Sequence, residues 1–220
     1  MKYLDQYIGQ MIEIELSSKK RLSGKLVEYG SDIVIVFNGQ NFYYIPVTHV
    51  VFITKSESIE NEVINDAPTP IVGDKLSLQK ILTNAKGIFV EVLIAGNQSV
   101  YGYITQIKND YVAFHSPSFK TILIQIAHMK WITPYLDRTP YLVEPKKTLL
   151  SSNLDLADSF EEQVTRLKGE VVIFDLGKDP NKIGLIKNSV DQMVELATGN
   201  GQVNYLNQTH IKTVHGPIIG

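Results

Sequence analysis

The sequence contains no cysteine, which excludes disulfide bonds, thiolate catalysis and cysteine-ligated zinc or iron–sulfur sites. No apolar run approaches the roughly 20 residues that a membrane-spanning helix requires. The N-terminal segment MKYLDQYIGQ has no apolar stretch long enough for a signal peptide, so we expect synthesis in the cytoplasm without export by the general secretory route. A basic excess is also missing, because 21 Lys and Arg face 23 Asp and Glu, and this balance argues against a nucleic-acid-binding protein.

The sequence does contain a threefold internal repeat. Four anchors recur in the same order: a glycine, a second glycine 15 residues later, an aspartate and a closing histidine. They are Gly9, Gly24, Asp32 and His49, then Gly87, Gly102, Asp110 and His128, then Gly169, Gly184, Asp191 and His210. Four ordered anchors in three copies are hard to obtain by chance, so the copies predict three related structural units.

Each copy has a pattern that is typical of β structure. The runs MIEIEL, IFVEVLI and EVVIFDL predict strands, and the second glycine falls inside the next strand, where it indicates a sharp bend or a close backbone approach. Bends of this kind help small barrels to close. We therefore predict a mainly β protein of three tandem small barrels of the SH3-like or Sm-like kind, each preceded by a short helix.

The domain boundaries follow from the three copies and from two proline-containing connectors. The prediction is barrel 1 over 1–56, a linker over 57–75, barrel 2 over 76–137, a linker over 138–157 and barrel 3 over 158–220. A unit this short buries little surface by itself, so we expect the three units to stabilise one another or to complete an oligomer.

The repeated histidines and aspartates are the first candidates for chemistry, because imidazoles bind metals and transfer protons. Each histidine occupies the same place in its own unit, however, and a shared site would require three separate groups to converge. The alternative is that each histidine bonds backbone at the corner before the last strand. The aspartates occupy turns, where a carboxylate accepts hydrogen bonds from backbone N–H groups. We expect no metal site and no cofactor.

Other catalytic patterns are weak as well. The glycine-rich segment TGNGQ at 198–202 lies between two predicted strands, which favours a hairpin turn over a phosphate-binding loop. Nothing indicates the pair of neighbouring carboxylates that glycoside hydrolysis needs. We therefore predict no catalytic residues, no enzymatic activity and no small-molecule substrate.

A basic hairpin and a tyrosine-rich strand in the first copy form a candidate interaction surface. Its residues are Lys19, Lys20, Arg21, Lys25, Tyr43 and Tyr44. Basic loops bind phosphates and tyrosines stack on bases, so an Sm-like RNA-binding protein is the alternative function. The corresponding turns of the other copies, AGNQS and GKDPN, are not basic, and the Asp-x-x-apolar-Asn signature of RNA-binding Sm proteins is missing. The sequence therefore favours a structural role over RNA binding.

The closing segments FYYIPVTHVVFIT and ILIQIAHMKWIT, with the opening IGQMIEIEL, resemble the bacterial spore coat protein B family, whose Sm-like repeats occur in spore-forming Firmicutes. The resemblance runs through all three copies and is weakest in the third, which ends THIKTVHG. Some members carry a Ser/Lys-rich tail that has no counterpart here, so roles of that tail are not carried over. The resemblance implies a structural coat component that is made in the mother-cell cytoplasm and assembled onto the spore surface.

These observations together predict a non-enzymatic structural protein of the spore coat. Its barrel edges and surfaces would contact other coat proteins and further copies of itself, because exposed strand edges favour pairing with another strand. In that mode strand four of one barrel pairs with strand five of the next. A hydrolase or sugar-binding protein is a third reading, and it predicts a deep pocket with perturbed acids.

Overall fold

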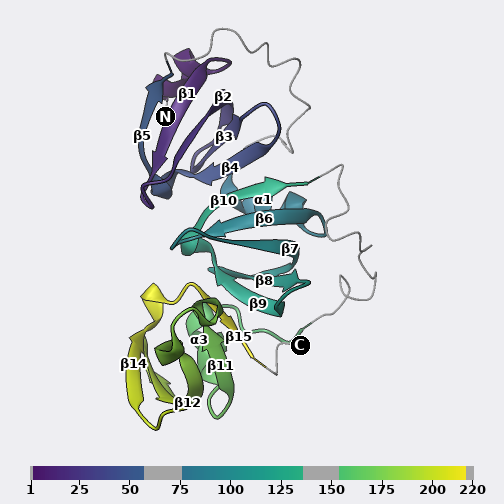
Figure 1. Ribbon diagram of the computed structural model, residues 1–220. Helices are drawn as coiled ribbons and strands as arrows, with labels where there is room; N and C mark the ends of the chain where they lie inside the picture. The colour runs from purple at the N-terminus through teal and green to yellow at the C-terminus, as the bar shows by residue number, and fades with distance from the viewer. Residues whose placement is uncertain (1, 57–75, 136–153, 217–220) are drawn as a thin grey trace. The chain divides into compact units, whose positions relative to one another are not determined.

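The computed structural model describes residues 2–56, 76–135 and 154–216 (Figure 1). The parts of the three sequence copies that it covers are called repeats 1, 2 and 3. The prediction of a mainly β protein is confirmed, because each repeat contributes five strands. The predicted linker over 57–75 and residues 138–153 of the second linker lie outside the described residues.

The elements follow the same order in each repeat. Repeat 1 contains the 3-10 helix η1 (Lys2–Tyr7), β1 (Met11–Leu16), β2 (Arg21–Tyr29), β3 (Ile33–Phe37), β4 (Phe42–Pro46), η2 (Val47–His49) and β5 (Val50–Lys55). Repeat 2 contains α1 (Leu78–Ala85), β6 (Phe89–Ile94), β7 (Gln98–Ile107), β8 (Tyr111–Ser116), β9 (Lys120–Gln125), η3 (Ile126–His128) and β10 (Met129–Pro134). Repeat 3 contains α3 (Phe160–Arg166), β11 (Val171–Phe174), η5 (Asp175–Gly177), η6 (Pro180–Lys182), β12 (Ile183–Val190), β13 (Met193–Thr198), β14 (Val203–Asn207), η7 (Gln208–His210) and β15 (Thr213–His215).

The prediction of three tandem closed barrels, each preceded by a helix, is wrong. The strands form one open 15-stranded antiparallel sheet in the order β14-β13-β12-β11-β15-β9-β8-β7-β6-β10-β4-β3-β2-β1-β5. The described residues contain two α-helices, α1 and α3, and the segment before the first repeat is the 3-10 helix η1. In repeats 2 and 3 closure fails because strand five pairs on one side with its own strand one and on the other side with strand four of the preceding repeat. In repeat 1 strand five, β5, pairs with β1 and lies at the end of the sheet.

The chain divides into two compact units, one from residues 1–101 and 129–142 and one from residues 102–128 and 143–220. Each unit has its own apolar core. The core of the first unit gathers alternate side chains of β1 with those of β2 and β3, and it includes Ile14, Leu26 and Val34. The core of the second unit includes Phe160 of α3, which Figure 1 shows beside the strands of repeat 3. Alternation produces this arrangement, since the burial of β1 switches at every residue.

The repeated second glycine allows strands two and three of each repeat to approach closely. A Cβ on Gly24 would lie 2.6 Å from the carbonyl oxygen of Phe37, and one on Gly102 would lie 2.0 Å from that of His115. Gly184 meets the carbonyl of Ala197 at 2.2 Å. Real Cβ atoms do not tolerate such distances, so each position requires glycine. The first glycines, Gly9, Gly87 and Gly169, instead have left-handed backbone after the preceding helix.

Candidate functional site: the joints between repeats and the two open edges

The first joint connects repeats 1 and 2 within the first unit. Strand β4 pairs antiparallel with β10, and Tyr44 lies opposite Ile132. Both side chains are buried, and every residue of β10 is buried as well. Strand five of repeat 2 is therefore an interior strand, with β6 on its other side.

The second joint connects repeats 2 and 3 within the second unit and has the same register. Strand β9 pairs with β15, and Leu123 lies opposite Val214. Tyr44 and Leu123 each lie five residues before the repeated histidine of their own repeat, while Ile132 and Val214 each lie four residues after theirs. The two joints are therefore the same pairing of strand four with strand five, the pairing that the sequence led us to expect between barrels.

The repeated aspartates act at these joints. Asp32 accepts a hydrogen bond from the backbone N–H of Leu78, the first residue of α1, at 2.9 Å. Asp110 accepts one from the backbone N–H of Phe160, the first residue of α3, at 2.8 Å. A carboxylate at a helix N-terminus satisfies a donor that has no partner inside the helix. Asp191 lies at an exposed turn of repeat 3, after which the chain contributes no further repeat.

The repeated histidines lie at the joints too. The Nδ1 of His49 is 2.9 Å from the Nζ of Lys130, and the Nε2 of His128 is 2.9 Å from the carbonyl oxygen of Thr209. In both cases the partner belongs to the following repeat. His210 of repeat 3 is exposed. Within the described residues no group of three or more metal-ligating side chains forms a metal site.

Two polar groups that the repeat pattern did not reveal lie at or beside the joints. Lys130 on β10 is buried, and its ammonium donates to the Oγ of Ser17 at 2.8 Å as well as to His49. This burial lowers the pKa of Lys130. Asp175 is buried beside Lys182 and Lys212, and it accepts the backbone N–H of Lys212 at 2.7 Å. Neither residue recurs in all three copies, so self-comparison of the sequence could not find them.

Two strands of the sheet have a single neighbour among the described residues. Strand β5 ends the sheet at one side and β14 ends it at the other. Val51 of β5 is 59% exposed, and Tyr205 of β14 is 66% exposed. Strand β14 (VNYLN) carries no charge, and β5 (VVFITK) carries one only at its last residue, Lys55. Edge strands are usually protected by charges, prolines or bulges, so these two edges are suited to pairing with a further strand.

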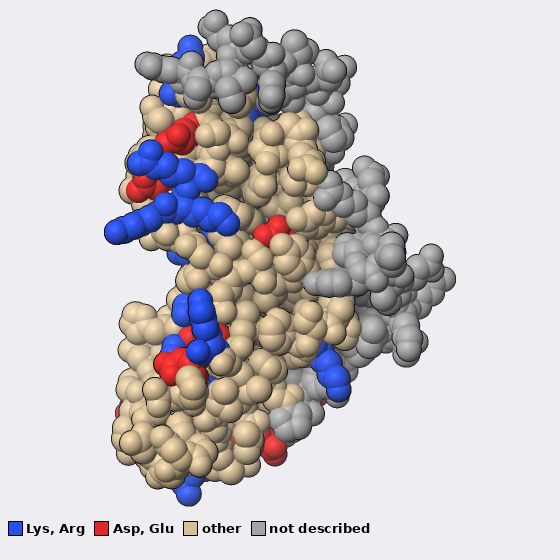
Figure 2. Space-filling view, viewed as in Figure 1, with Lys and Arg blue, Asp and Glu red and all other residues tan. Residues whose placement is uncertain are grey.

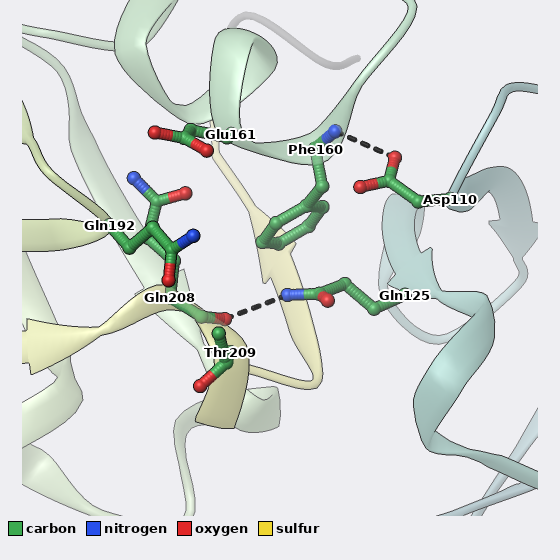
Figure 3. Close-up of a pocket in the computed structure, with 7 residues that line it drawn as sticks. All are labelled: Asp110, Gln125, Phe160, Glu161, Gln192, Gln208 and Thr209. Atoms are coloured by element: carbon green, nitrogen blue, oxygen red, sulfur yellow. Dashed lines mark hydrogen bonds between the residues drawn. The ribbon is translucent and has the colours of Figure 1, made fainter.

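A pocket of about 150 Å³ lies beside the second joint (Figure 3). Its lining is Asp110, Gln125, Phe160, Glu161, Gln192, Gln208 and Thr209. Most of its polar groups bond within the protein: Asp110 holds α3, and the Nε2 of Gln125 donates to the carbonyls of Gln208 and Ile211, both at 2.8 Å.

The candidate interaction surface of repeat 1 is largely occupied by contacts within the protein. Arg21 bonds Glu13 and Glu15 at 3.1 and 2.9 Å, and Figure 2 shows basic and acidic side chains side by side on this repeat. Lys20 lies over the Trp131 ring, with its Nζ 4.5 Å from the ring centroid. Lys19 is exposed and Lys25 is half-buried.

The two tyrosines of this surface face the protein as well. Tyr44 is buried in the first joint, and Tyr43 packs edge-on against Trp131 with ring centroids 5.1 Å apart. The structure therefore does not bring the six residues together as one exposed basic and aromatic surface, and nothing in it supports the RNA-binding alternative. No helix among the described residues is long and apolar enough to cross a membrane.

Edge-to-edge joining of related five-stranded repeats defines the class: an open-sheet, tandem-repeat β protein. Within that class the chain belongs to the YwrJ family. It is 36% identical over 225 residues to the uncharacterized protein YwrJ of Bacillus subtilis (strain 168), an alignment that covers 99% of this chain and 100% of that protein. Residues 159–214 also match the family described as YwrJ third domain.

A second relative is more distant. The chain is 28% identical over 141 residues to Spore coat protein B of Bacillus subtilis (strain 168). That alignment covers 64% of this chain and 35% of the relative, so the chain spans about a third of that protein's length. The resemblance predicted from the sequence is confirmed as a partial relationship, and the family is that of YwrJ.

Proposed function

We propose that this protein is a non-enzymatic structural component of the spore coat, made in the cytoplasm of the sporulating cell and held in the coat by contacts with other coat proteins through its open strand edges. The observation that carries the proposal is the pair of open edges, β14 without a charge and β5 with one only at its last residue, in a chain related to Spore coat protein B. An unprotected edge offers a row of backbone donors and acceptors to any strand that can pair with it.

The contacts that the aspartate and histidine side chains make within the protein support a structural role. Asp32 and Asp110 hold helices, His49 and His128 contact the following repeat, and Asp175 neutralises two lysines. Groups that bond in this way stabilise the joints between repeats. We therefore assign the function to surfaces and edges rather than to a catalytic centre.

Localisation in a sporulating Bacillus tests the proposal. A fluorescent fusion of the full chain is expected to form a shell around the developing spore, and the untagged protein is expected in coat extracts of purified spores. The tag alone should stay diffuse. A protein that remains in the mother-cell cytosol and is absent from coat extracts would refute the proposal.

A pair of double variants tests the edges themselves. Val51→Lys with Val203→Lys adds a charge to each open edge, whereas Val171→Lys with Val190→Lys changes valines of similar exposure on the inner strands β11 and β12. Charged edge residues prevent strand pairing. We expect the edge variant to be lost from coat extracts and the inner-strand variant to remain. Equal retention of the two variants would show that the open edges do not hold the protein in the coat.

A further inference from the structure

We infer that the two open edges are complementary halves of one more joint, so that copies of this chain associate head to tail, with β14 of one copy paired to β5 of the next. The inference rests on the proposed function for its setting and deepens it by naming a second copy as the partner of these edges. Its basis is the pair of joints already present inside the chain.

The first step is the identity of the strands that are left open. Both internal joints pair strand four of one repeat with strand five of the following repeat. Among the described residues, strand four of repeat 3, β14, pairs only with β13, and strand five of repeat 1, β5, pairs only with β1. One copy therefore offers an open strand four, β14, and the next copy offers an open strand five, β5. These are the two kinds of strand that each internal joint pairs.

The second step is the register. The equivalent positions are Tyr44, Leu123 and Tyr205 in strand four, and Ile53, Ile132 and Val214 in strand five. The second joint also pairs Ile124 with Thr213. If β14 and β5 pair in the same register, Ile53 lies opposite Tyr205 and Phe52 lies opposite Leu206 of the neighbouring copy.

The third step is the direction of the backbone donors. In the second joint the N–H of Gln125 donates to the carbonyl of Lys212 at 3.0 Å, and the equivalent residues at the open edges are Asn207 and Val51. The N–H of Gln208 already bonds Gln192 on the β13 side at 2.7 Å. Successive N–H groups alternate sides along a strand, so the N–H groups of Asn207 and Tyr205 point to the open side, as the inferred joint requires.

The fourth step is burial. Tyr44 is 1% exposed in its joint, whereas Tyr205 at the equivalent position is 66% exposed. Lys130 is 8% exposed, whereas Val51 at its equivalent position is 59% exposed. The open edges thus expose Tyr205 where both internal joints bury the equivalent Tyr44 and Leu123, and they expose Val51 where the first joint buries Lys130. A second copy would remove this apolar surface from water.

The contact joins two different edges, so it is heterologous and leaves one free β5 and one free β14 on every open assembly. Such contacts build rings when the rotation closes and fibres when it does not. Pairing two β5 edges, by contrast, would reproduce neither internal joint.

Disulfide mapping tests the register, since the natural chain has no cysteine to interfere. Ile53→Cys and Tyr205→Cys full-length proteins, carrying tags of different mass, are mixed and oxidised mildly. Opposed residues of antiparallel strands have Cα atoms about 4.5–5.5 Å apart, within disulfide range. We expect the mixed dimer to be the main product on a non-reducing gel.

The matched control is a mixture of Val51→Cys with Tyr205→Cys, in which the cysteines are two residues out of register. Diagonal neighbours lie about 7–8 Å apart, so we expect at most about a tenth of the cross-linked product. Equal yields in the two mixtures would indicate random collision and overturn the inference.

Sedimentation velocity of the uncross-linked protein provides an independent readout. The natural chain is expected to form larger species as its concentration rises, and Tyr205→Pro should weaken this association by at least about tenfold. Proline at this position removes an outward N–H and leaves the bonds to β13, so the variant should fold, which its thermal melt checks. A natural chain that stays monomeric at every concentration would also overturn the inference.

The two proposals fail in different ways. A monomeric chain that is still found in coat extracts would refute head-to-tail association and leave the coat function standing with another partner. A chain that associates in the inferred register but never reaches the coat would refute the proposed function and leave the association standing.

Discussion

The two joints share one backbone register but are filled by different side chains. In the first joint Trp131 of β10 packs edge-on against Tyr43 and lies beneath Lys20. In the second joint the amide of Gln125 bonds two carbonyls, and the hydroxyl of Tyr111 donates to the carbonyl of Ala157 at 2.6 Å. The comparison teaches that the repeated aspartate, the histidine position and the strand register define the joint, while the remaining side chains are free to diverge.

A lysine two residues after the repeated histidine shows the same divergence. In the first joint Lys130 reaches into repeat 1 and bonds Ser17 and His49. In the second joint Lys212 bonds Asp175 of its own repeat. At the open edge the equivalent residue is Val51, which is exposed. Equivalent places in the three repeats therefore carry a lysine where a joint exists and an apolar residue where none does.

The largest difference between the joints is expected at the first residue of the helix that each aspartate holds. Phe160 is 2% exposed and packs edge-on against Tyr111, whereas Leu78 is only half-buried. Replacing a buried phenylalanine by alanine removes its contacts and leaves a cavity. We expect Phe160→Ala to lower the free energy of unfolding by about 3–5 kcal/mol and Leu78→Ala by about 1–2 kcal/mol in urea denaturation.

Asp175→Asn tests the contribution of the buried carboxylate that lies beside the second joint. Bonds to Lys182 and Lys212 hold the pKa of Asp175 below its ordinary value, although burial alone would raise it. We expect Asp175→Asn to cost about 2 kcal/mol at neutral pH, because the half-buried lysine partners lose a charge-assisted hydrogen bond. Asparagine tolerates the left-handed backbone at this position, so conformational strain does not contribute.

The pH dependence of the same variant identifies the cause. A carboxyl group whose pKa is lower in the folded state stabilises the protein above its unfolded value of 3.8 and loses this contribution as the pH falls through the folded pKa. The natural protein should therefore lose stability in acid more steeply than Asp175→Asn does. Parallel stability curves for the two proteins between neutral and acid pH would contradict the assignment.

Local sequence patterns predicted most of the strands because their causes are local. The alternation in MIEIEL reflects one buried face of β1, and the invariant spacing to Gly24 reflects a backbone contact within the same repeat. The repeated aspartates and histidines were expected to bond groups of their own turns and corners. In the structure Asp32 and Asp110 accept backbone N–H groups from the helix of the following repeat, and His128 contacts a backbone carbonyl of the following repeat.

Barrel closure could not be predicted in the same way because it depends on the partner of strand five. The sequence of β10 allows pairing with β6, the first strand of its repeat, whether the repeat closes into a barrel or stays open. Only the tertiary structure shows that the other side of β10 pairs with β4. The same contact explains why Tyr44, an expected surface residue, is buried. Lys130 and Asp175 escaped notice because neither recurs in all three copies: Val51 of repeat 1 takes the position of Lys130.

The smallest effects are expected at the repeated aspartates, and they separate joined from open repeats. Asp32→Asn and Asp110→Asn replace a charged acceptor at a helix N-terminus with a neutral one, so each should lower the free energy of unfolding by about 0.5–1 kcal/mol. Asp191→Asn should change it by less than about 0.5 kcal/mol in the isolated chain, since this aspartate lies at an exposed turn. Chemical denaturation of the three variants at one pH measures the difference. An equal cost at all three positions would mean that the aspartate serves its own turn rather than the helix of the following repeat, and the common architecture of the joints would then rest on strand register alone.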